Sequence, residues 1–273
     1  MLVAVLSAQQ WCAAQDAASP DLTSDLIRYL TDEAPAQPAP PTPAPALPGK
    51  GIYGKGWKGL GPNLLRDQKE IWLFPVSLAR GKHLKPTLAV IGVTAGLIAV
   101  DKYSARYFNE TESFQGFNRT FSGPNTALGT EIIPAALYLA GLARKDTYAQ
   151  ETFFLAARAV ISSEIVTIVM KDVDRRSRPA NGDYSNTWFS EKQGSYLRGI
   201  GSFPSGHTIA AFAVATVYAD RYPNPGWRRW LAYGLAGLVG FSRLPLHSHY
   251  ASDVFLGAAL GYAIAHYGVG GPR

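Results

Sequence analysis

Three short blocks of the sequence carry residues that can bind and transfer a phosphoryl group. Each block combines cationic, hydroxyl or imidazole side chains with proline or glycine. The blocks are Lys171-Asp-Val-Asp-Arg-Arg-Ser-Arg178-Pro179, Pro204-Ser205-Gly206-His207 and Ser242-Arg243-Leu-Pro-Leu-His-Ser-His249-Tyr-Ala-Ser-Asp253. We interpret them together as one site for a phosphate ester or diphosphate.

Five of these residues are suited to holding the phosphate. The side chains of Lys171, Arg178 and Arg243 can neutralise the charge that grows on the equatorial oxygens during phosphoryl transfer. Ser205 can donate its hydroxyl to a phosphate oxygen, and Gly206 lets an anion approach the free N–H groups of a helix N-terminus. The sequence therefore predicts a phosphate-binding cluster.

Basic residues at helix ends also have ordinary structural roles. Such a side chain usually interacts with the helix dipole or extends to the nearest water. We assign this ordinary role to Arg175, Arg176 and Arg198.

The histidines supply the chemistry. Because His249 and Asp253 are four residues apart, they share one face of a helix, and the carboxylate can orient the imidazole. An imidazole held in this way can attack phosphorus and carry the phosphoryl group until water removes it. His207 is then available to protonate the leaving oxygen as general acid.

Metal or cofactor chemistry is not indicated. No histidine stands in an HExxH or similar ligand spacing, and the single Cys12 excludes a cysteine-based zinc site. We predict a reaction that needs no metal and no cofactor.

Six apolar stretches must position these residues, at 86–100, 127–143, 152–170, 207–219, 230–242 and 254–268. They are rich in Ala, Gly, Leu and Val, lack the alternation of strands and are too long for typical strands. We therefore expect an all-α fold, a six-helix bundle. If successive helices run antiparallel, the helix ends that carry the three blocks lie on the same side of the bundle.

The composition favours a bundle that spans a membrane. Only 17% of the residues are charged, against about 25% in typical soluble domains, and small residues let helices pack closely in lipid. Most of the stretches are shorter than the roughly 20 residues of a membrane span, so a soluble bundle stays open. We expect a multi-pass membrane protein.

Two features disagree about its orientation. The loops 144–151 and 220–229 carry five basic residues, which places these loops in the cytoplasm and the site on the outer, periplasmic face. A cleaved signal peptide followed by six spans would instead place the region before the first span outside. We favour the orientation given by the loops.

The chain before residue 86 differs in composition from the rest. Residues 1–20 predict either a signal-like segment or an apolar N-terminus without a targeting role, since no basic residue precedes the apolar run. Residues 21–50 predict a Pro/Ala-rich linker. Residues 51–85 predict either a helix at the membrane interface or one packed on the bundle. Residues 86–268 are then the catalytic domain.

Together the three blocks match the signature KxxxxxxRP, PSGH and SRxxxxxHxxxD. The sequence resembles the type 2 phosphatidic acid phosphatase (PAP2) and vanadium haloperoxidase superfamily over roughly residues 86–268. The resemblance implies an all-helical core, and six membrane spans in the lipid phosphatase branch. It also implies His249 as nucleophile with Asp253 as its partner, His207 as acid, and Lys171, Arg178, Ser205, Gly206 and Arg243 as phosphate contacts.

The signature by itself does not separate the branches of this superfamily. Our first hypothesis is a membrane enzyme that dephosphorylates a lipid phosphate or diphosphate. A soluble periplasmic acid phosphatase is the alternative; a vanadium haloperoxidase or a non-catalytic helix bundle ranks lower. The net charge of +6 comes without a basic run interleaved with aromatics, which argues against a nucleic-acid partner. The oligomeric state is not indicated.

Overall fold

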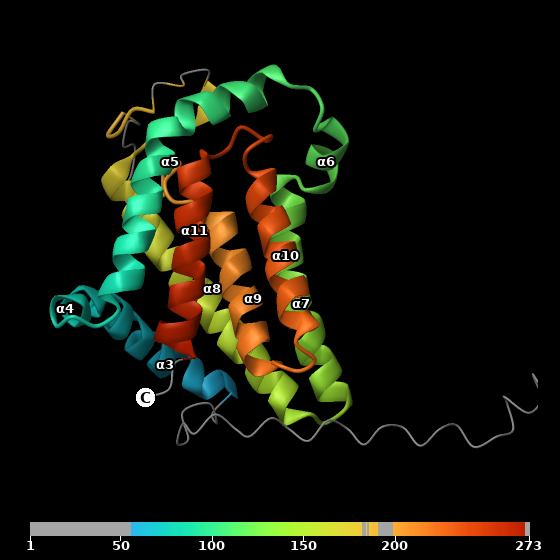
Figure 1. Ribbon diagram of the computed structural model, residues 1–273. Helices are drawn as coiled ribbons and strands as arrows, with labels where there is room; N and C mark the ends of the chain where they lie inside the picture. Colours follow the sequence, from blue (N-terminus) through green and yellow to red (C-terminus); the bar gives the residue numbers. More distant parts are fainter. Residues whose placement is uncertain (1–55, 182–183, 185, 191–198, 271–273) are drawn as a thin grey trace, which may run out of the picture. The chain divides into compact units, whose positions relative to one another are not determined.

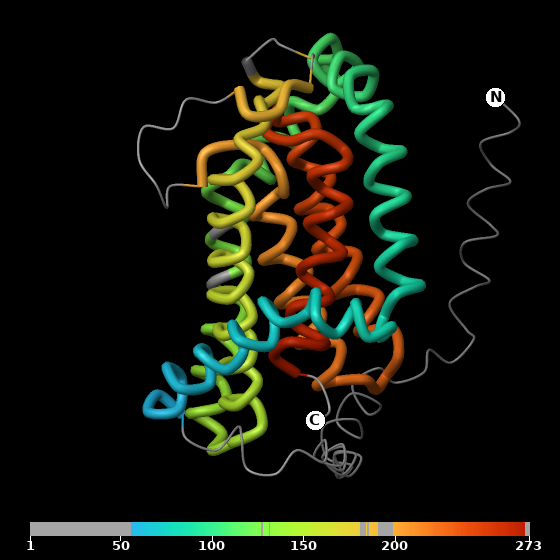
Figure 2. Tube along the Cα trace, turned by 90° about the vertical axis from the view of Figure 1, so that its left-hand side faces the viewer, coloured from blue at the N-terminus to red at the C-terminus, as the bar shows by residue number. Residues whose placement is uncertain are grey.

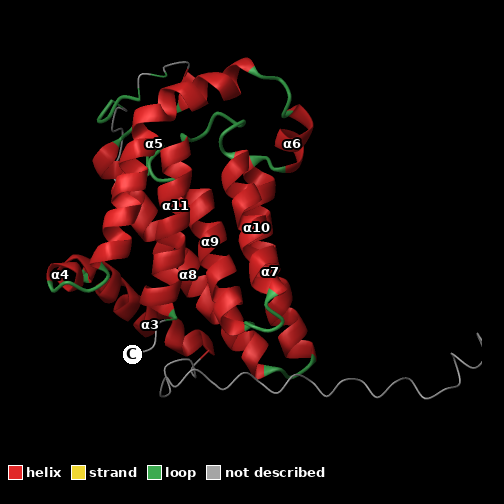
Figure 3. Cartoon of the chain, viewed as in Figure 1, coloured by secondary structure: helices red, strands yellow, loops and turns green. Residues whose placement is uncertain are grey.

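Helices account for most of the chain that the structure describes. The computed structural model describes residues 56–181, 184, 186–190 and 199–270. The chain divides into two units, Met1–Ala46 and Leu47–Arg273, and every described residue belongs to the second. None of the described residues forms a strand (Figure 3), which confirms the all-α prediction. The predicted signal-like segment 1–20 and linker 21–50 lie outside the described residues.

All six predicted stretches fall within helices. These are α5 (Leu84–Glu110), α7 (Gly123–Ala143), α8 (Thr147–Asp174), α9 (Gly206–Arg221), α10 (Trp227–Ser242) and α11 (Ala251–Ala263), which runs on into a π-helical turn, η2 (Ile264–Val269). The described chain also contains α3 (Gly56–Trp72), α4 (Phe74–Ala79), α6 (Gln115–Thr120) and a 3₁₀ turn, η1 (Pro179–Asn181). The fold is thus a helical bundle with additional helices beyond the predicted six.

Three helices are long and apolar enough to cross a membrane. Within α5, α7 and α8, windows of 18 residues reach mean hydropathies of 1.5, 1.4 and 1.8. Large apolar side chains on α5 are exposed, with Leu88 and Ile91 each 56% accessible. Contiguous apolar surface of this kind is costly in water and favourable in lipid. These helices are those of a membrane protein.

Helix α9 lies at the centre of the bundle, where it packs against α8, α10 and α11 (Figure 1). Its buried face consists mainly of alanine and threonine, small side chains that allow neighbouring helices to come close. On α11, the glycines Gly257 and Gly261 face it: a Cβ at Gly261 would lie 2.4 Å from the Ile209 carbonyl oxygen. This GxxxG spacing brings the backbones of α9 and α11 together.

Helices α3 and α4 lie across the lower part of the bundle in Figure 2. Helix α3 contacts α8 and η2, and a buried ion pair fixes it there. Two nitrogens of Arg158 donate to the two carboxylate oxygens of Asp67, at 2.6 and 2.8 Å. Helix α3 also leaves Trp57 and Leu65 largely exposed. The helix therefore packs on the bundle and also presents an apolar surface.

The helix ends that carry the three sequence blocks lie together. The C-terminal ends of α8 and α10 and the N-terminal ends of α9 and α11 are all at the upper end in Figure 1. The C-terminal part of α5 reaches over this end toward α6. The alternating direction of α8 to α11 thus places the chemistry at one end of the bundle.

Candidate active site

The predicted site residues meet at this end of the bundle. Lys171 lies in the last turn of α8, and Arg178 lies in the loop that follows. The start of α9 carries Ser205, Gly206 and His207, and Arg243 is the C-cap of α10. His249 lies just before α11, and Asp253 lies in its first turn. Backbone hydrogen bonds join the segments, from Ser205 N–H to the Asp253 carbonyl at 3.1 Å and from His249 N–H to the Arg243 carbonyl at 3.3 Å.

The orientation of the His249 ring determines which nitrogen is available to react. Its Nδ1 lies 2.7 Å from the carbonyl oxygen of Ser202. A carbonyl oxygen only accepts hydrogen bonds, so Nδ1 carries the proton in the neutral ring and Nε2 keeps its lone pair. The backbone therefore holds His249 in the tautomer that a nucleophile at Nε2 requires.

The surroundings of His249 also keep the ring neutral. Only 4% of the residue is exposed. Burial lowers the pKa of His249 to about 4, and the nearby cation of Lys171 acts in the same direction, while the hydrogen bond to Asp253 opposes them. At neutral pH the imidazole is consequently uncharged and able to donate its lone pair.

Asp253 interacts with His249 less directly than its spacing in the sequence predicts. Its Oδ2 lies 3.5 Å from Nδ1 of His249 and accepts a hydrogen bond from the N–H of Tyr250 at 2.8 Å. Its Oδ1 accepts from Arg176. The carboxylate is close enough to stabilise an imidazolium, but the nearer partner of Nδ1 is the Ser202 carbonyl.

Arg176 is the centre of a buried network, so the ordinary helix-end role assigned to it from the sequence is wrong. The side chain is fully buried and pairs with two carboxylates, Asp253 and, at 2.6 Å, Asp101 of α5. It also donates to Ser252 at 2.8 Å and to Asn186 at 2.6 Å. A desolvated guanidinium is retained only when its donors are used in this way.

The same arginine also contacts two aromatic rings and the backbone segment that holds His249. Its guanidinium lies over the ring of Tyr250 at 4.2 Å and that of Trp188 at 4.9 Å. Its carbonyl accepts from the N–H of Ser202, whose own carbonyl holds His249. Gly201, with φ of +130°, permits this approach, since a Cβ there would lie 3.3 Å from the Arg176 nitrogen. One sequence signal was available: Asp101 directly follows an apolar stretch, where a charge needs a partner.

Three cations surround the space in front of the histidines. Arg243 is 2% exposed, and its guanidinium is fixed by the Ser242 hydroxyl at 2.7 Å and the Phe121 carbonyl at 2.5 Å. Burial lowers the pKa of Arg243 to about 10, which leaves it charged at neutral pH. Arg178 donates to the Gly201 carbonyl at 3.0 Å.

Lys171 is the least engaged of these cations. It is 7% exposed, and its ammonium forms no ion pair within 4.0 Å among the residues that the structure describes. Both histidines lie within electrostatic range of Lys171 and Arg178. Positive charge in this number, largely screened from water, makes a strong anion site.

The N-terminus of α9 adds backbone donors. The Ser205 hydroxyl accepts from Thr208 at 2.8 Å, which leaves its own proton free to donate elsewhere. In the described part of the chain no side chain caps this helix, so its first N–H groups remain available to a ligand. Gly206 is packed closely, because a Cβ there would lie 3.2 Å from the Thr167 methyl group.

His207 stands at the edge of this cluster and is only partly buried. Its Nε2 lies 3.3 Å from the Gly123 carbonyl oxygen, a long contact in which Nε2 must carry the proton. Burial and the nearby Arg243 lower the pKa of His207 to about 4, so the ring is neutral at neutral pH when no anion is bound.

Comparison with known proteins gives two curated relatives. The chain is similar to a lipid A 1-phosphatase of Porphyromonas gingivalis, 41% identical over 68 residues, which cover 24% of this chain and 15% of that protein. It is also similar to a lipid A 4'-phosphatase of the same organism, 24% identical over 149 residues, which cover 52% of this chain and 61% of that protein. The chain thus spans less than two thirds of either relative.

The comparison with solved structures gives a partial alignment. The aligned structure is the crystal structure of a transmembrane PAP2 type phosphatidylglycerolphosphate phosphatase from Bacillus subtilis, with 20% sequence identity and a TM-score of 0.44. The alignment covers 66% of this chain and 92% of that one.

A family model gives the clearest result. Residues 152–270 match the model described as the PAP2 superfamily. This segment contains all the predicted site residues, from Lys171 in α8 to Asp253 in α11. The match therefore coincides with the cluster at the end of the bundle, and it is this segment of the chain that is similar to the PAP2 superfamily.

Proposed function

We propose that this protein is a phosphatase that hydrolyses a phosphomonoester or diphosphate of a membrane lipid through a phosphohistidine on His249. The observation that carries the proposal is the His249 tautomer. Its Nε2 keeps a lone pair near the cations of Lys171 and Arg178, because Nδ1 donates to the Ser202 carbonyl.

In the first step, Nε2 of His249 attacks phosphorus and the bond from phosphorus to the leaving oxygen breaks. The negative charge of the bound phosphate favours the imidazolium form of His207, and this cation donates its Nε2 proton to that oxygen, so the lipid leaves as an alcohol or a monophosphate. Lys171, Arg178 and Arg243 balance the charge on the transferring group. The imidazole becomes cationic during this step, and Asp253 stabilises it at 3.5 Å.

In the second step, water attacks the phosphorus of the phosphohistidine and the bond to Nε2 breaks. His207, now the neutral imidazole, accepts a proton from this water and becomes imidazolium again, which restores the starting protonation state. The products are inorganic phosphate and free His249. These residues suffice for the cycle without a metal ion in any step.

Two observations favour a lipid substrate over the soluble esters of an acid phosphatase. The site lies at one end of a bundle with three helices of membrane-span character. Both curated relatives are named lipid A phosphatases, although each matches only a part of this chain. Lipid A 1- and 4'-phosphates are therefore the first lipids to test, with phosphatidic acid and undecaprenyl diphosphate beside them.

We further infer that the site faces the outer, periplasmic side of a bacterial inner membrane. The opposite end of the bundle carries Arg144 and Lys145 between α7 and α8, and Arg228 and Arg229 in the first turn of α10, as expected for a cytoplasmic side. The fifth basic residue there, Arg221, is 6% exposed and pairs with Glu151, so it adds little to this bias.

The decisive experiment measures phosphate release by the detergent-purified protein, with EDTA present, from these lipids and from p-nitrophenyl phosphate. We expect the His249→Ala variant to fall to background and the His266→Ala control, in η2 beyond the C-terminal end of α11, to retain wild-type activity. Release that persists in His249→Ala would eliminate the phosphohistidine. Release from p-nitrophenyl phosphate alone would support the acid phosphatase alternative.

The role of His207 has a separate test. A general acid contributes about 10²- to 10⁴-fold for a leaving group that needs a proton. His207→Ala should therefore lose this factor on a lipid phosphate, but much less on p-nitrophenyl phosphate, whose leaving group departs unprotonated. An equal loss on both substrates would assign His207 to phosphate binding instead.

A further inference from the structure

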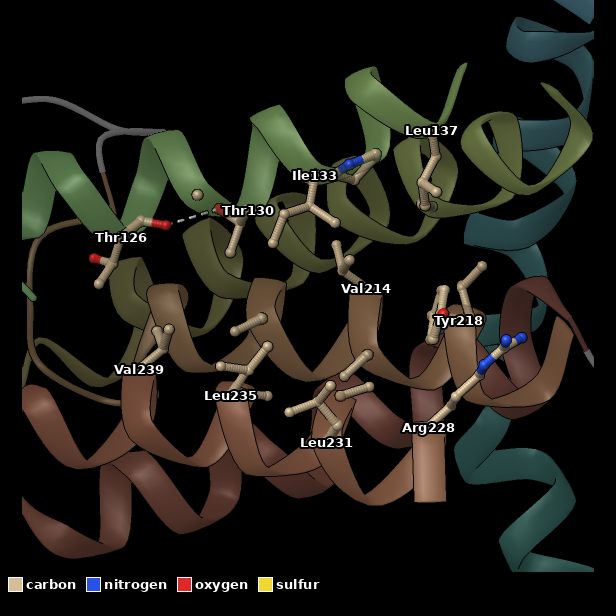
Figure 4. Close-up of a pocket in the computed structure, with 18 of the residues that line it drawn as sticks. Thr126, Thr130, Ile133, Leu137, Val214, Tyr218, Arg228, Leu231, Leu235 and Val239 are labelled. Atoms are coloured by element: carbon tan, nitrogen blue, oxygen red, sulfur yellow. Dashed lines mark hydrogen bonds between the residues drawn. The ribbon is translucent and has the colours of Figure 1, made fainter. Parts of the chain in front are cut away.

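A long apolar cavity lies between α7, α9 and α10. Its volume is about 520 Å³, within the range of about 300–1,000 Å³ that small-molecule sites occupy. Figure 4 shows side chains from all three helices directed into it. Among them are Thr130 and Ile133 of α7, Val214 of α9, and Leu231, Leu235 and Val239 of α10. We call this space the α7–α10 groove.

The groove runs lengthwise along the bundle. On α10 its lining extends from Trp227 to Val239, which at about 1.5 Å per residue corresponds to about 18 Å. This length is close to the depth of one leaflet, half of the roughly 30 Å hydrocarbon core of a bilayer. The lining is apolar over most of this length, so water would find few hydrogen-bonding partners inside.

One end of the groove adjoins the catalytic cluster. Phe121 lines the groove, and its carbonyl oxygen accepts from Arg243 at 2.5 Å. Two residues later, the carbonyl of Gly123 contacts His207 at 3.3 Å. If the cations hold the phosphate of a lipid, the rest of that lipid would therefore lie next to this end of the groove.

Small side chains keep the groove open. Gly129 of α7, Ala211 and Ala215 of α9, and Ala232 and Ala236 of α10 all line it. Helix α7 packs mainly on α8, and α10 packs on α9, so the space between α7 and α10 is not closed by their own contacts. In a membrane this apolar space is suited to a hydrocarbon chain.

We propose that the α7–α10 groove binds one acyl chain of the substrate lipid while its phosphate occupies the cluster of Lys171, Arg178 and Arg243. The proposal rests on the proposed lipid phosphatase function and names the part of the protein that recognises the chain. A chain of leaflet length would extend from the cluster along α10 toward the opposite end of the bundle.

Two glycines provide a matched pair of variants. Gly129 lines the groove and Gly234 of α10 does not, and a Cβ at either meets no atom within 4 Å. Both Gly129→Trp and Gly234→Trp should therefore fold. Only Gly129→Trp places a large ring in the groove, and Val214→Phe narrows the same space from α9.

The measurement compares kcat/KM for long-chain phosphatidic acid with that for its water-soluble short-chain analogue, in one detergent. Displacing two methylene groups of the bound chain from the groove is enough to lower kcat/KM about tenfold. We expect Gly129→Trp and Val214→Phe to lose at least that factor on the long-chain lipid and to keep wild-type kcat/KM on the short analogue. Gly234→Trp should match wild type on both. Equal losses on both substrates, no loss on either, or the same loss in Gly234→Trp would overturn the proposal.

A second readout does not depend on turnover. A long-chain phosphate lipid with a photoactivatable group at the end of one chain is cross-linked to the wild-type protein, and the labelled peptides are identified by mass spectrometry. Label on α7, α9 or α10 residues of the groove that disappears in Gly129→Trp supports chain binding, even if no substrate is hydrolysed. Label on other residues would refute binding of the chain in the groove. Label in the groove without hydrolysis of any substrate would refute only the proposed catalytic function.

Discussion

At the scale of single residues, Arg176 supports the site through buried contacts with two carboxylates. It joins Asp101 of α5 to Asp253 of α11 in a region that water does not reach. Removing one member of a buried charged group leaves its partners uncompensated. Here those partners are two carboxylates, one of which is 3.5 Å from His249. We therefore regard Arg176 as a positioning residue.

This view predicts a change in pH dependence. In Arg176→Gln the unopposed carboxylates favour the imidazolium, so the pKa of His249, which burial lowers to about 4, should rise. Attack needs the neutral ring, so activity is lost as pH falls through this pKa. The acid limb of the kcat/KM profile should move to higher pH by roughly 1–3 units.

Arg175→Gln is the control, since this neighbouring arginine is only partly buried. It should leave the acid limb in place. If Arg176→Gln lowers kcat at all pH values without moving the limb, Arg176 supports the fold alone.

The sequence was sufficient to predict that the eight proposed site residues meet, because their side chains suit a phosphate and they stand at helix ends that an antiparallel bundle brings together. It did not reveal what holds His249. The Ser202 carbonyl is a backbone group, which any residue supplies, so its role has no signature in the sequence. The network around Arg176 was missed for another reason: its partners Asp101 and Asp253 are 75 and 77 residues away along the chain.

At the scale of helices, the approach of α11 to α9 depends on Gly257 and Gly261. A Cβ at Gly261 would meet the backbone oxygen of Ile209 at 2.4 Å, too close for the helices to stay where they are. Since α9 begins at the phosphate site and α11 carries Asp253, separating them would also disturb the site.

We expect Gly261→Ala to lower the thermal unfolding midpoint in detergent and to reduce phosphatase activity. The control is Gly237→Ala on α10, where an added Cβ meets no atom within 4 Å. It should be neutral or slightly stabilising, because alanine has about 1 kcal/mol better helix propensity than glycine. Equal midpoints for the two variants would mean that the α9–α11 contact adapts without cost.

Helical periodicity and composition predicted which stretches are helices, but not how far each extends. Stretch 86–100 became α5, which runs to Glu110 and includes charged and aromatic residues. Its polar end is stabilised by contacts that are distant in the sequence, such as that of Asp101 with Arg176. The short α6 has no apolar face of its own strong enough to be found by pattern.

At the scale of the whole helical unit, the ion pair between Asp67 and Arg158 attaches α3 to α8. Both side chains are almost completely buried. We expect Asp67→Asn to destabilise the protein by about 3–5 kcal/mol, because Arg158 would remain charged without its partner. Thermal unfolding in detergent measures the effect.

The double variant Asp67→Leu with Arg158→Leu separates charge from packing. It should recover most of the lost stability, since removing both charges removes the desolvation cost as well. A double variant as unstable as Asp67→Asn would show that the geometry of the pair, rather than its charge balance, attaches α3.

Exposed apolar side chains on α5 and α7, and a site at one end of the same bundle, also determine how a lipid would arrive. A substrate dissolved in the bilayer reaches such an enzyme by lateral diffusion in two dimensions. The rate would then follow the mole fraction of substrate among the surrounding lipids, and diluting the membrane with inert lipid would slow turnover at constant bulk concentration.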